Sequence, residues 1–233
     1  MKNRILFGLT IILSALLLVS ILSAAIPAKQ ELEKINLVNY KDGTLKASID
    51  GKGKGSDVCY KLLGVKWNQQ VNYVINPTNS QGLSESFISN SIYLGAEQWD
   101  ANTAYDLFGT YQIDSSAYYG NQNYRNEISF GNIQDTGVIA ITTLWVDPSS
   151  KSIIESDIEF DTDWQWGDAT KNASLMDVQN IATHELGHAI GLGDIYSSTC
   201  VAETMYGYSK AVETIKRTLN KADITGLRKI YGR

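Results

Sequence analysis

The stretch HELGHAIGLGD, residues 184–194, decides the expected fold and site. It contains both histidines of the 233-residue chain, His184 and His188, spaced four apart. In a helix, residues four apart share one face, so both imidazoles can reach one ion. Zinc accepts imidazole nitrogen readily and keeps a position for water in catalytic sites. Glu185 can take a proton from that water, so the pattern predicts a catalytic zinc helix rather than two unrelated histidines.

A third ligand must be another residue type, because no histidine remains. Gly191 can adopt the left-handed conformation that ends a helix and reverses the chain. Asp194 follows three residues later, where that turn can return its carboxylate to the metal. Glu203 is the competing carboxylate, although its spacing of 15 residues after His188 is short for a ligand on a separate helix. We expect Asp194, because only this scheme explains Gly191.

These residues resemble the metzincin signature, with Asp194 where the usual third ligand is histidine. The stretch ETMYGY at 203–208 looks like the Met-turn that lies beneath the metal in that clan, with Met205 as its methionine. The pattern is more closely similar to the matrixins, the catalytic domains of matrix metallopeptidases and their prokaryotic relatives, some of which use Asp as third ligand. The resemblance covers about residues 60–233, with supporting stretches at 66–67, 96–99, 157–161 and 219–227.

The resemblance implies an α+β, zincin-like fold. It implies a twisted, five-stranded mixed sheet with an antiparallel edge strand, and three helices with the zinc helix at the cleft floor. The edge strand would be residues 138–142, binding extended peptide by β-augmentation through Ile139 and Ala140. Tyr208 would help wall the pocket for the side chain after the scissile bond. The implied activity is that of a zinc-dependent endopeptidase, with one catalytic zinc and Glu185 as general base.

Other ligands and partners follow from the family and from composition. Asp161 matches a calcium ligand of the matrixins, but its partner position is Trp164, so calcium is only a second candidate ion. A net charge of −5 and a pI near 5.1 argue against nucleic acid, because phosphates need a basic patch. The expected partner is a polypeptide substrate, and the expected state is a monomer.

The sequence at the N-terminus indicates that the chain is exported. Lys2 and Arg4 precede an uncharged apolar run at 5–26, and residues 23–25 are small enough for a signal peptidase to cut. The same run exceeds the roughly 18 residues needed for a membrane span, so an uncleaved anchor is the alternative. In either case the remaining chain is expected outside the cytoplasm, secreted or held at the outer face of the cytoplasmic membrane.

The chain has two cysteines, Cys59 and Cys200. In an oxidising compartment we expect them to pair, which would close a loop of about 140 residues. Two independent buried thiols are one alternative. Cys59 as a cap over the zinc, as in the pro-segments of many matrixins, is the other.

The rest of the chain divides into three regions. Residues 1–26 are the signal or anchor, 27–58 a polar linker or short pro-segment rather than core, and 59–233 the peptidase domain. Alternation predicts strands near 71–75, 127–130, 138–146 and 158–160, and apolar periodicity predicts helices near 84–102, 174–191 and 220–231. The second helix should begin near Ser174, because residues 174–177 have capping-box-like spacing, with Asp177 in place of the usual Glu or Gln. Residues 104–127 are expected to form an irregular surface loop.

Overall fold

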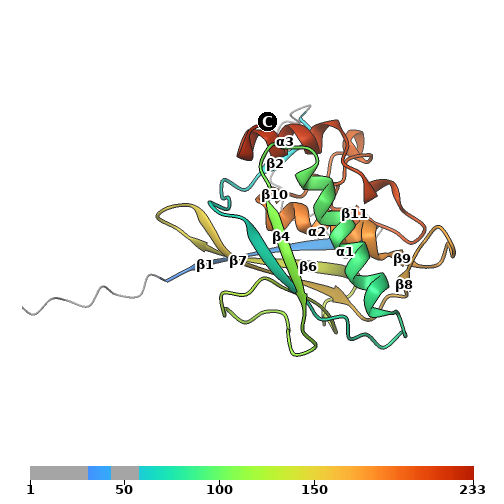
Figure 1. Ribbon diagram of the computed structural model, residues 1–233. Helices are drawn as coiled ribbons and strands as arrows, with labels where there is room; N and C mark the ends of the chain where they lie inside the picture. The colour runs from blue at the N-terminus through green and yellow to red at the C-terminus, as the bar shows by residue number, and fades with distance from the viewer. Residues whose placement is uncertain (1–30, 43–57) are drawn as a thin grey trace, which may run out of the picture. The chain divides into compact units, whose positions relative to one another are not determined.

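A mixed seven-stranded sheet forms the centre of this computed structural model, which describes residues 31–42 and 58–233. The expected export segment and the glycine-rich stretch at 51–56 lie outside the described residues. Within the described ranges, no helix has the length and apolar character needed to cross a membrane. The sheet order is β11-β1-β6-β7-β5-β3-β4 (Figure 1). Its strands are β1 (Glu33–Lys41), β3 (Val71–Ile75), β4 (Phe108–Ile113), β5 (Glu127–Gly131), β6 (Val138–Asp147), β7 (Ser152–Asp161) and β11 (Tyr208–Ser209).

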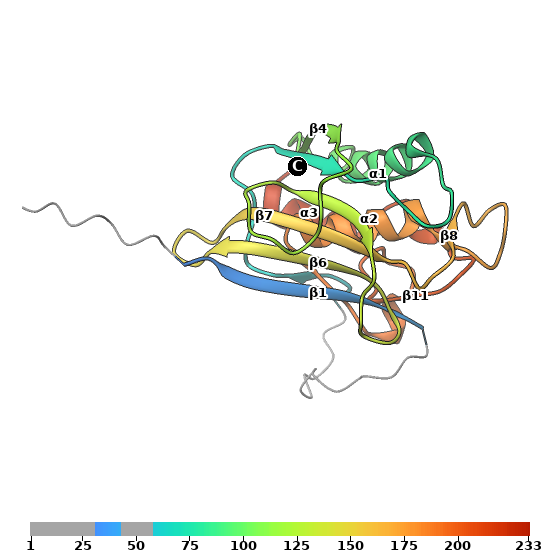
Figure 2. The same cartoon turned by 90° about the horizontal axis from the view of Figure 1, so that it is seen from below.

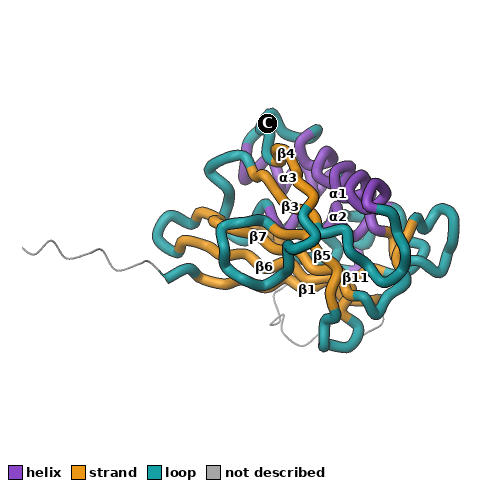
Figure 3. The backbone as a smooth tube through the Cα atoms, turned by 60° about the horizontal axis from the view of Figure 1, so that its bottom comes forward, coloured by secondary structure: helices purple, strands orange, loops and turns teal. Residues whose placement is uncertain are grey.

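Helices and short paired segments complete the fold. Figure 2 shows β7, β6 and β1 side by side, and Figure 3 shows the helices grouped beside the strands. Two small two-stranded sheets pair β2 with β10 and β8 with β9. The remaining elements are α1 (Glu85–Asp100), α2 (Val178–Ala189), α3 (Lys221–Tyr231), the 3-10 turns η1 (Ser198–Cys200) and η2 (Ile215–Arg217), β2 (Lys61–Leu62), β8 (Trp166–Gly167), β9 (Met176–Asp177) and β10 (Leu192–Gly193).

Helix α1 begins where the sequence predicts and packs on α2. The hydroxyl of Ser84 accepts a hydrogen bond from the Phe87 amide, which satisfies one of the free N–H groups at the helix start. Near its end, the fully buried Trp99 donates its indole N–H to the Thr183 carbonyl of α2 at 2.9 Å. This hydrogen bond joins the two helices and positions the segment from His184 to His188 against the core.

The predicted N-cap of α2, Ser174, lies three residues before the observed one. Asp177 is the N-cap, because its carboxylate accepts from the Asn180 amide at 2.9 Å. Ser174 instead donates its hydroxyl to Asn172 in a local turn, and Met176 pairs with Trp166 in a short parallel bridge. A side chain that satisfies the N2 or N3 amide defines the helix start, and here that side chain is the carboxylate.

The expectation of an irregular loop at 104–127 is also wrong, because the segment contains β4. This strand pairs parallel with β3 and closes one edge of the sheet. Phe108 is its one buried residue, and the remaining positions are half-buried or exposed. A strand with water on most of its side chains lacks the alternating apolar pattern by which strands are recognised.

The sheet has seven strands rather than five, and β6 is not its edge. The four strands located from the sequence are present as β3, β5, β7 and β6, and β4 is a fifth; β6 is antiparallel to β7 and the other neighbours in this group are parallel. However, β1 pairs antiparallel along β6, from Glu33 opposite Val146 to Tyr40 opposite Val138. Strand β11 then pairs with the end of β1. Residues 33–41 therefore belong to the sheet, contrary to the expectation that 27–58 stand outside it.

The predicted disulfide is present between Cys59 and Cys200, with Cα atoms 5.4 Å apart. It joins the segment before β2 to η1, across 141 residues of sequence. Cys59 is therefore not available as a cap over a metal. A cross-link over so long a loop stabilises mainly by restricting the unfolded chain, by about 5 kcal/mol in the chain-entropy model.

Replacing both cysteines with serine should lower the free energy of unfolding by about 2–5 kcal/mol. Urea unfolding of the variant and of the oxidised wild type measures this difference. Because Cys200 is buried, the chemically reduced wild type is the control that separates the lost bridge from the new hydroxyl. An unchanged urea midpoint on reduction would contradict the expected contribution.

Candidate metal centre and cleft

Two imidazoles on α2 are oriented by backbone carbonyls. His184 Nδ1 lies 2.7 Å from the Thr204 carbonyl oxygen, and His188 Nδ1 lies 2.8 Å from that of Leu192. A carbonyl oxygen can only accept, so each Nδ1 carries the proton and donates it. In the neutral imidazole, the lone pair of each ring is therefore on Nε2, the tautomer that a metal ligand needs.

The turn after α2 brings Asp194 back to the histidines. Gly191 has a φ of +98°, and a Cβ there would stand 2.3 Å from the Val65 carbonyl oxygen, so only glycine fits. Asp194 Oδ1 then lies 3.2 Å from His184 Nε2 and 3.3 Å from His188 Nε2. The structure thus brings together the three ligands that the sequence predicts.

The competing carboxylate, Glu203, lies elsewhere. Its Oε2 accepts hydrogen bonds from the Ala222 and Asp223 amides, at 3.0 and 3.3 Å, and so serves the start of α3. A carboxylate at a helix N-terminus satisfies free N–H groups and opposes the positive end of the helix dipole. Glu203 therefore caps α3 and does not act as a metal ligand.

The three converging atoms fit a cation. They lie within 4.8 Å of one another and, among the described residues, form the one group of three acidic, histidine or cysteine side chains able to hold an ion. All are buried, and apart from one another they have no partner in the described part of the chain. Burial lowers the pKa of His188, but Asp194 outweighs it and raises that pKa to about 9. Burial opposes ionisation of Asp194, but the two histidines hold its pKa well below the usual range.

Glu185 lies beside these atoms with one oxygen held and one free. Its Oε2 accepts a hydrogen bond of 2.7 Å from the Thr142 hydroxyl, on β6. Its Oε1 is buried and has no hydrogen-bond partner among the described residues. Thr142 fixes the carboxylate while leaving Oε1 able to accept a proton. The sequence pattern did not single out Thr142, because a threonine in a buried strand carries no distinctive signal.

The segment around Met205 packs directly beneath α2. A Cβ at Gly187 would stand 2.3 Å from Met205 Sδ and 2.6 Å from the Trp99 ring, so glycine permits this close approach. The buried Asp223 carboxylate accepts from the Thr204 and Met205 amides at 2.7 and 3.1 Å. Since the Thr204 carbonyl orients His184, α3 holds the metal site through Asp223. Sequence reasoning missed this role, although Asp223 also completes a capping box with Asn220.

The residues predicted to bind substrate lie along β6 and β11. Ile139 and Ala140 are fully buried in β6, and Ala140 is paired with Asn39 of β1. Tyr208 begins β11 and pairs with Tyr40. Tyr196, which the sequence reading did not single out, packs its ring 5.2 Å from that of Tyr208. Burial, together with the charge of Asp194 and a hydrogen bond to it, raises the pKa of Tyr196.

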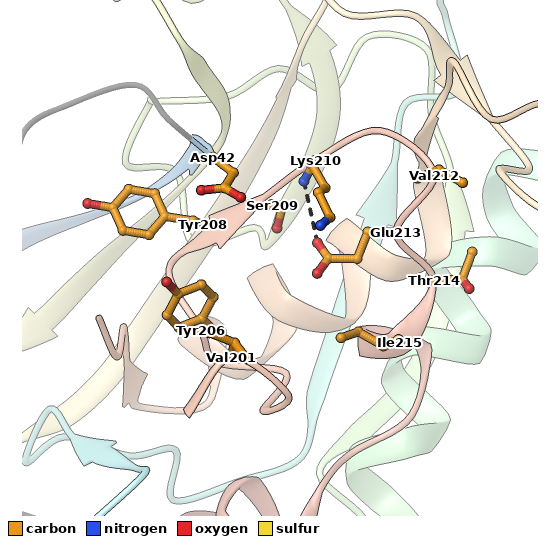
Figure 4. A pocket seen from close by; sticks show the side chains of 10 residues that line it. All are labelled: Asp42, Val201, Tyr206, Tyr208, Ser209, Lys210, Val212, Glu213, Thr214 and Ile215. Carbon is orange, nitrogen blue, oxygen red and sulfur yellow. Dashed lines mark hydrogen bonds between the residues drawn. The ribbon is translucent and has the colours of Figure 1, made fainter. Parts of the chain in front are cut away.

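A cavity of about 470 Å³ lies next to Tyr208 (Figure 4). Tyr206 and Tyr208 line one side and Val212 and Ile215 the other. The fully buried Lys216 donates through Nζ to the carbonyls of two of these lining residues, Tyr206 and Tyr208, both at 2.7 Å, and to Ser209 Oγ at 2.8 Å. Lys216 thereby ties β11 to η2. The sequence alone did not mark this lysine.

The expected calcium ligand, Asp161, is engaged by the backbone. Its Oδ1 accepts from the Ile133 and Asp163 amides, at 3.3 and 3.1 Å. Calcium at Asp161 stays a prediction.

The sequence matches a family model described as Matrixin over residues 66–232. Since this match covers more than half of the 233 residues, the chain belongs to the matrixin family. Metalloendoproteinase 1 of Glycine max is 41% identical over 78 residues, which make up 31% of this chain and 24% of that protein. Human matrix metalloproteinase-16 is 37% identical over 79 residues, 34% of this chain and 12% of that protein.

Karilysin of Tannerella forsythia matches over a longer stretch. It is 26% identical over 178 residues, 74% of this chain and 34% of karilysin. The chain therefore spans about a third or less of the length of these relatives.

The buried Lys216 predicts a specific pH dependence of stability. Burial lowers its pKa from 10.5 to about 8, so between those values the unfolded chain binds a proton that the folded chain does not. Stability therefore rises with pH across this window, and that contribution, about 3 kcal/mol, is lost as pH falls through 8. Urea unfolding from pH 7.5 to 10.5 should show this rise in the wild type and not in Lys216→Met.

The matched control is Lys221→Met, which removes an exposed lysine. It should keep the wild-type slope of stability against pH. Parallel slopes for wild type and Lys216→Met would contradict a lowered pKa at Lys216.

Proposed function

We propose that the chain is a zinc-dependent endopeptidase that hydrolyses peptide bonds of extended polypeptides outside the cytoplasm. One observation carries the proposal: two Nε2 atoms and a carboxylate oxygen converge, buried and without other partners among the described residues, beside the Glu185 oxygen that accepts no hydrogen bond from them. Three protein ligands with a fourth position left for water or substrate are the donor set of a catalytic zinc. Membership of the matrixin family supports the same assignment.

His184, His188 and Asp194 would hold the zinc. When bound, zinc polarises the scissile carbonyl and acidifies a bound water. The carbonyl partners of the two Nδ1 atoms fix the ring orientations, so the ligand set is arranged before the ion binds. Asp194 brings a negative charge where a neutral imidazole would bring none. We therefore expect a weaker Lewis acid and modest turnover.

Glu185 is proposed as the general base. Its Oε1 accepts the proton of the attacking water and later delivers it to the leaving amine. The hydrogen bond from Thr142 keeps Oε2 occupied, so that Oε1 is the oxygen available for this transfer. A structural metal site would have no use for a buried carboxylate held in this way.

Strand β6 supports a polypeptide substrate, and the disulfide supports a location outside the cytoplasm. The substrate strand would pair with β6 at Ile139 and Ala140, a position that β1 occupies in this structure, and its side chain after the scissile bond would enter beside Tyr208. The disulfide between Cys59 and Cys200 suits an oxidising compartment, as does the export segment expected at the N-terminus.

Glu185→Gln should retain one zinc per chain and lose at least about 100-fold in kcat, because it removes the base and keeps the ligands. The assay is cleavage of a quenched-fluorescence peptide library, with zinc content measured by mass spectrometry. Chelator should abolish cleavage by the wild type, and added zinc should restore it. Equal rates for the two zinc-loaded chains would contradict the role of Glu185, and a wild type that binds no zinc would contradict the metal centre.

A further inference from the structure

A second cavity, of about 260 Å³, gathers positive charge. Its lining comes from β2 and the residues after it, from the turn between β6 and β7, and from α3, which Figure 1 shows close to β2. Three lysines line it, Lys66, Lys151 and Lys229, whereas no aspartate or glutamate does. We call this cavity the basic hollow. Since the whole chain has 25 acidic and 20 basic residues, its local charge is opposite to the average.

The three ammonium groups of the basic hollow have no protein counter-charge. Among the described residues, no ion pair joins any of them to a carboxylate. Lys229 Nζ lies 5.9 Å from the centre of the Tyr60 ring, a contact that leaves its charge in place. Like charges brought to one cavity repel one another, so a bound anion would relieve that repulsion.

Lys151 occupies a backbone position that favours glycine. It has a φ of +57° in the turn between β6 and β7. Its amide donates to the Asp147 carbonyl at 2.9 Å, and its carbonyl accepts from the Lys66 amide at 3.2 Å. These are main-chain contacts that a glycine would also make, without the steric cost of a side chain in the left-handed region. A strained residue that the fold does not require points to a function for its side chain.

Apolar side chains complete the basic hollow and indicate the kind of anion. Leu62, which is 41% exposed, and Ile230 line it together with the lysines. A single carboxylate would neutralise only one of three ammonium groups. A phosphomonoester carries nearly two negative charges at neutral pH, and lysine binds phosphate as a point charge. The lining therefore suits a phosphate group attached to an apolar carrier.

The wall of the basic hollow also contacts the turn that carries the metal ligands. Leu62 pairs with Leu192, whose carbonyl accepts the proton of His188 Nδ1 at 2.8 Å. The Val65 carbonyl oxygen lies so close to Gly191 that a Cβ there would stand 2.3 Å from it. A ligand that orders this wall therefore also orders the turn between His188 and Asp194.

We propose that the basic hollow binds a phosphomonoester on an apolar carrier, and that this ligand strengthens metal binding through residues 62–66. The binding itself goes beyond the proposed peptidase function and does not depend on it. The coupling rests on the metal centre of that function. Because linkage is reciprocal, the metal ion would tighten the ester by the same factor as the ester tightens the metal ion.

Calorimetric titration of the full chain with n-butyl phosphate at pH 7.5 tests the binding. Lys151→Gly should weaken the affinity at least about fivefold, because it removes one charge-assisted contact. The same variant should be at least as stable to urea as the wild type, since glycine relieves the strained φ. Lys221→Met, which removes an exposed lysine of α3 outside the basic hollow, is the matched control and should keep the wild-type affinity. No binding by the wild type, or equal affinity in Lys151→Gly, would overturn the site.

Two further ligands test the chemical class. Inorganic phosphate lacks the apolar group and dibutyl phosphate carries only one charge, so each should bind at least about fivefold more weakly than n-butyl phosphate. Equal affinity for dibutyl phosphate would overturn the monoester assignment in favour of phosphodiesters, such as lipid headgroups. Each titration is run with and without zinc. Binding that requires zinc and is unchanged in Lys151→Gly would place the phosphate on the metal and overturn the site.

The coupling is measured as zinc affinity, by competition with a chromophoric chelator. Saturating n-butyl phosphate should tighten zinc binding at least about fivefold in the wild type and have no effect in Lys151→Gly. An unchanged zinc affinity in a wild type that binds the ester would overturn the coupling. None of these measurements uses hydrolysis, so their failure is distinct from failure of the peptidase function. A chain that binds the ester but no zinc would refute the metal centre and the coupling while supporting the basic hollow as a binding site.

Discussion

The contact of one carboxylate oxygen with two imidazole nitrogens is the interaction on which the other features depend. Asp194 reaches His184 and His188 only because Gly191 turns the chain under α2. Asp223 on α3 holds the loop whose carbonyl orients His184, and Gly187 lets Met205 pack against the same helix. Three separate segments therefore position three atoms that would be costly to bury without a cation.

The sheet and the candidate metal site are linked by a direct side-chain contact. The backbone of Thr142 is part of β6, and its hydroxyl donates a hydrogen bond to Glu185. A chain paired with β6 is therefore brought to Glu185 by the register of the sheet alone. In this structure β1 occupies that edge of β6, and the buried side chain of Asn39 has no hydrogen-bond partner among the described residues.

Much of the fold and site could be predicted from short patterns with strong local causes. The spacing of His184 and His188, the glycine at 191 and the apolar periodicity of 84–102 are local patterns, so they can be read directly from the sequence. Strands β4 and β1 were missed because few of their side chains are buried. An alternation of apolar and polar residues reveals a strand with one buried face, but it gives no sign of backbone hydrogen bonds. Contacts such as Thr142 with Glu185 join distant segments and leave no local trace.

X-ray absorption at the zinc edge of the zinc-loaded chain is the most direct test of the central claim, that two histidines and Asp194 hold the metal. It should show two nitrogen scatterers at about 2.0–2.1 Å, and oxygen at about 2.0–2.2 Å that decreases in Asp194→Ala. A sulfur scatterer near 2.3 Å, or a spectrum unchanged by Asp194→Ala, would contradict the account.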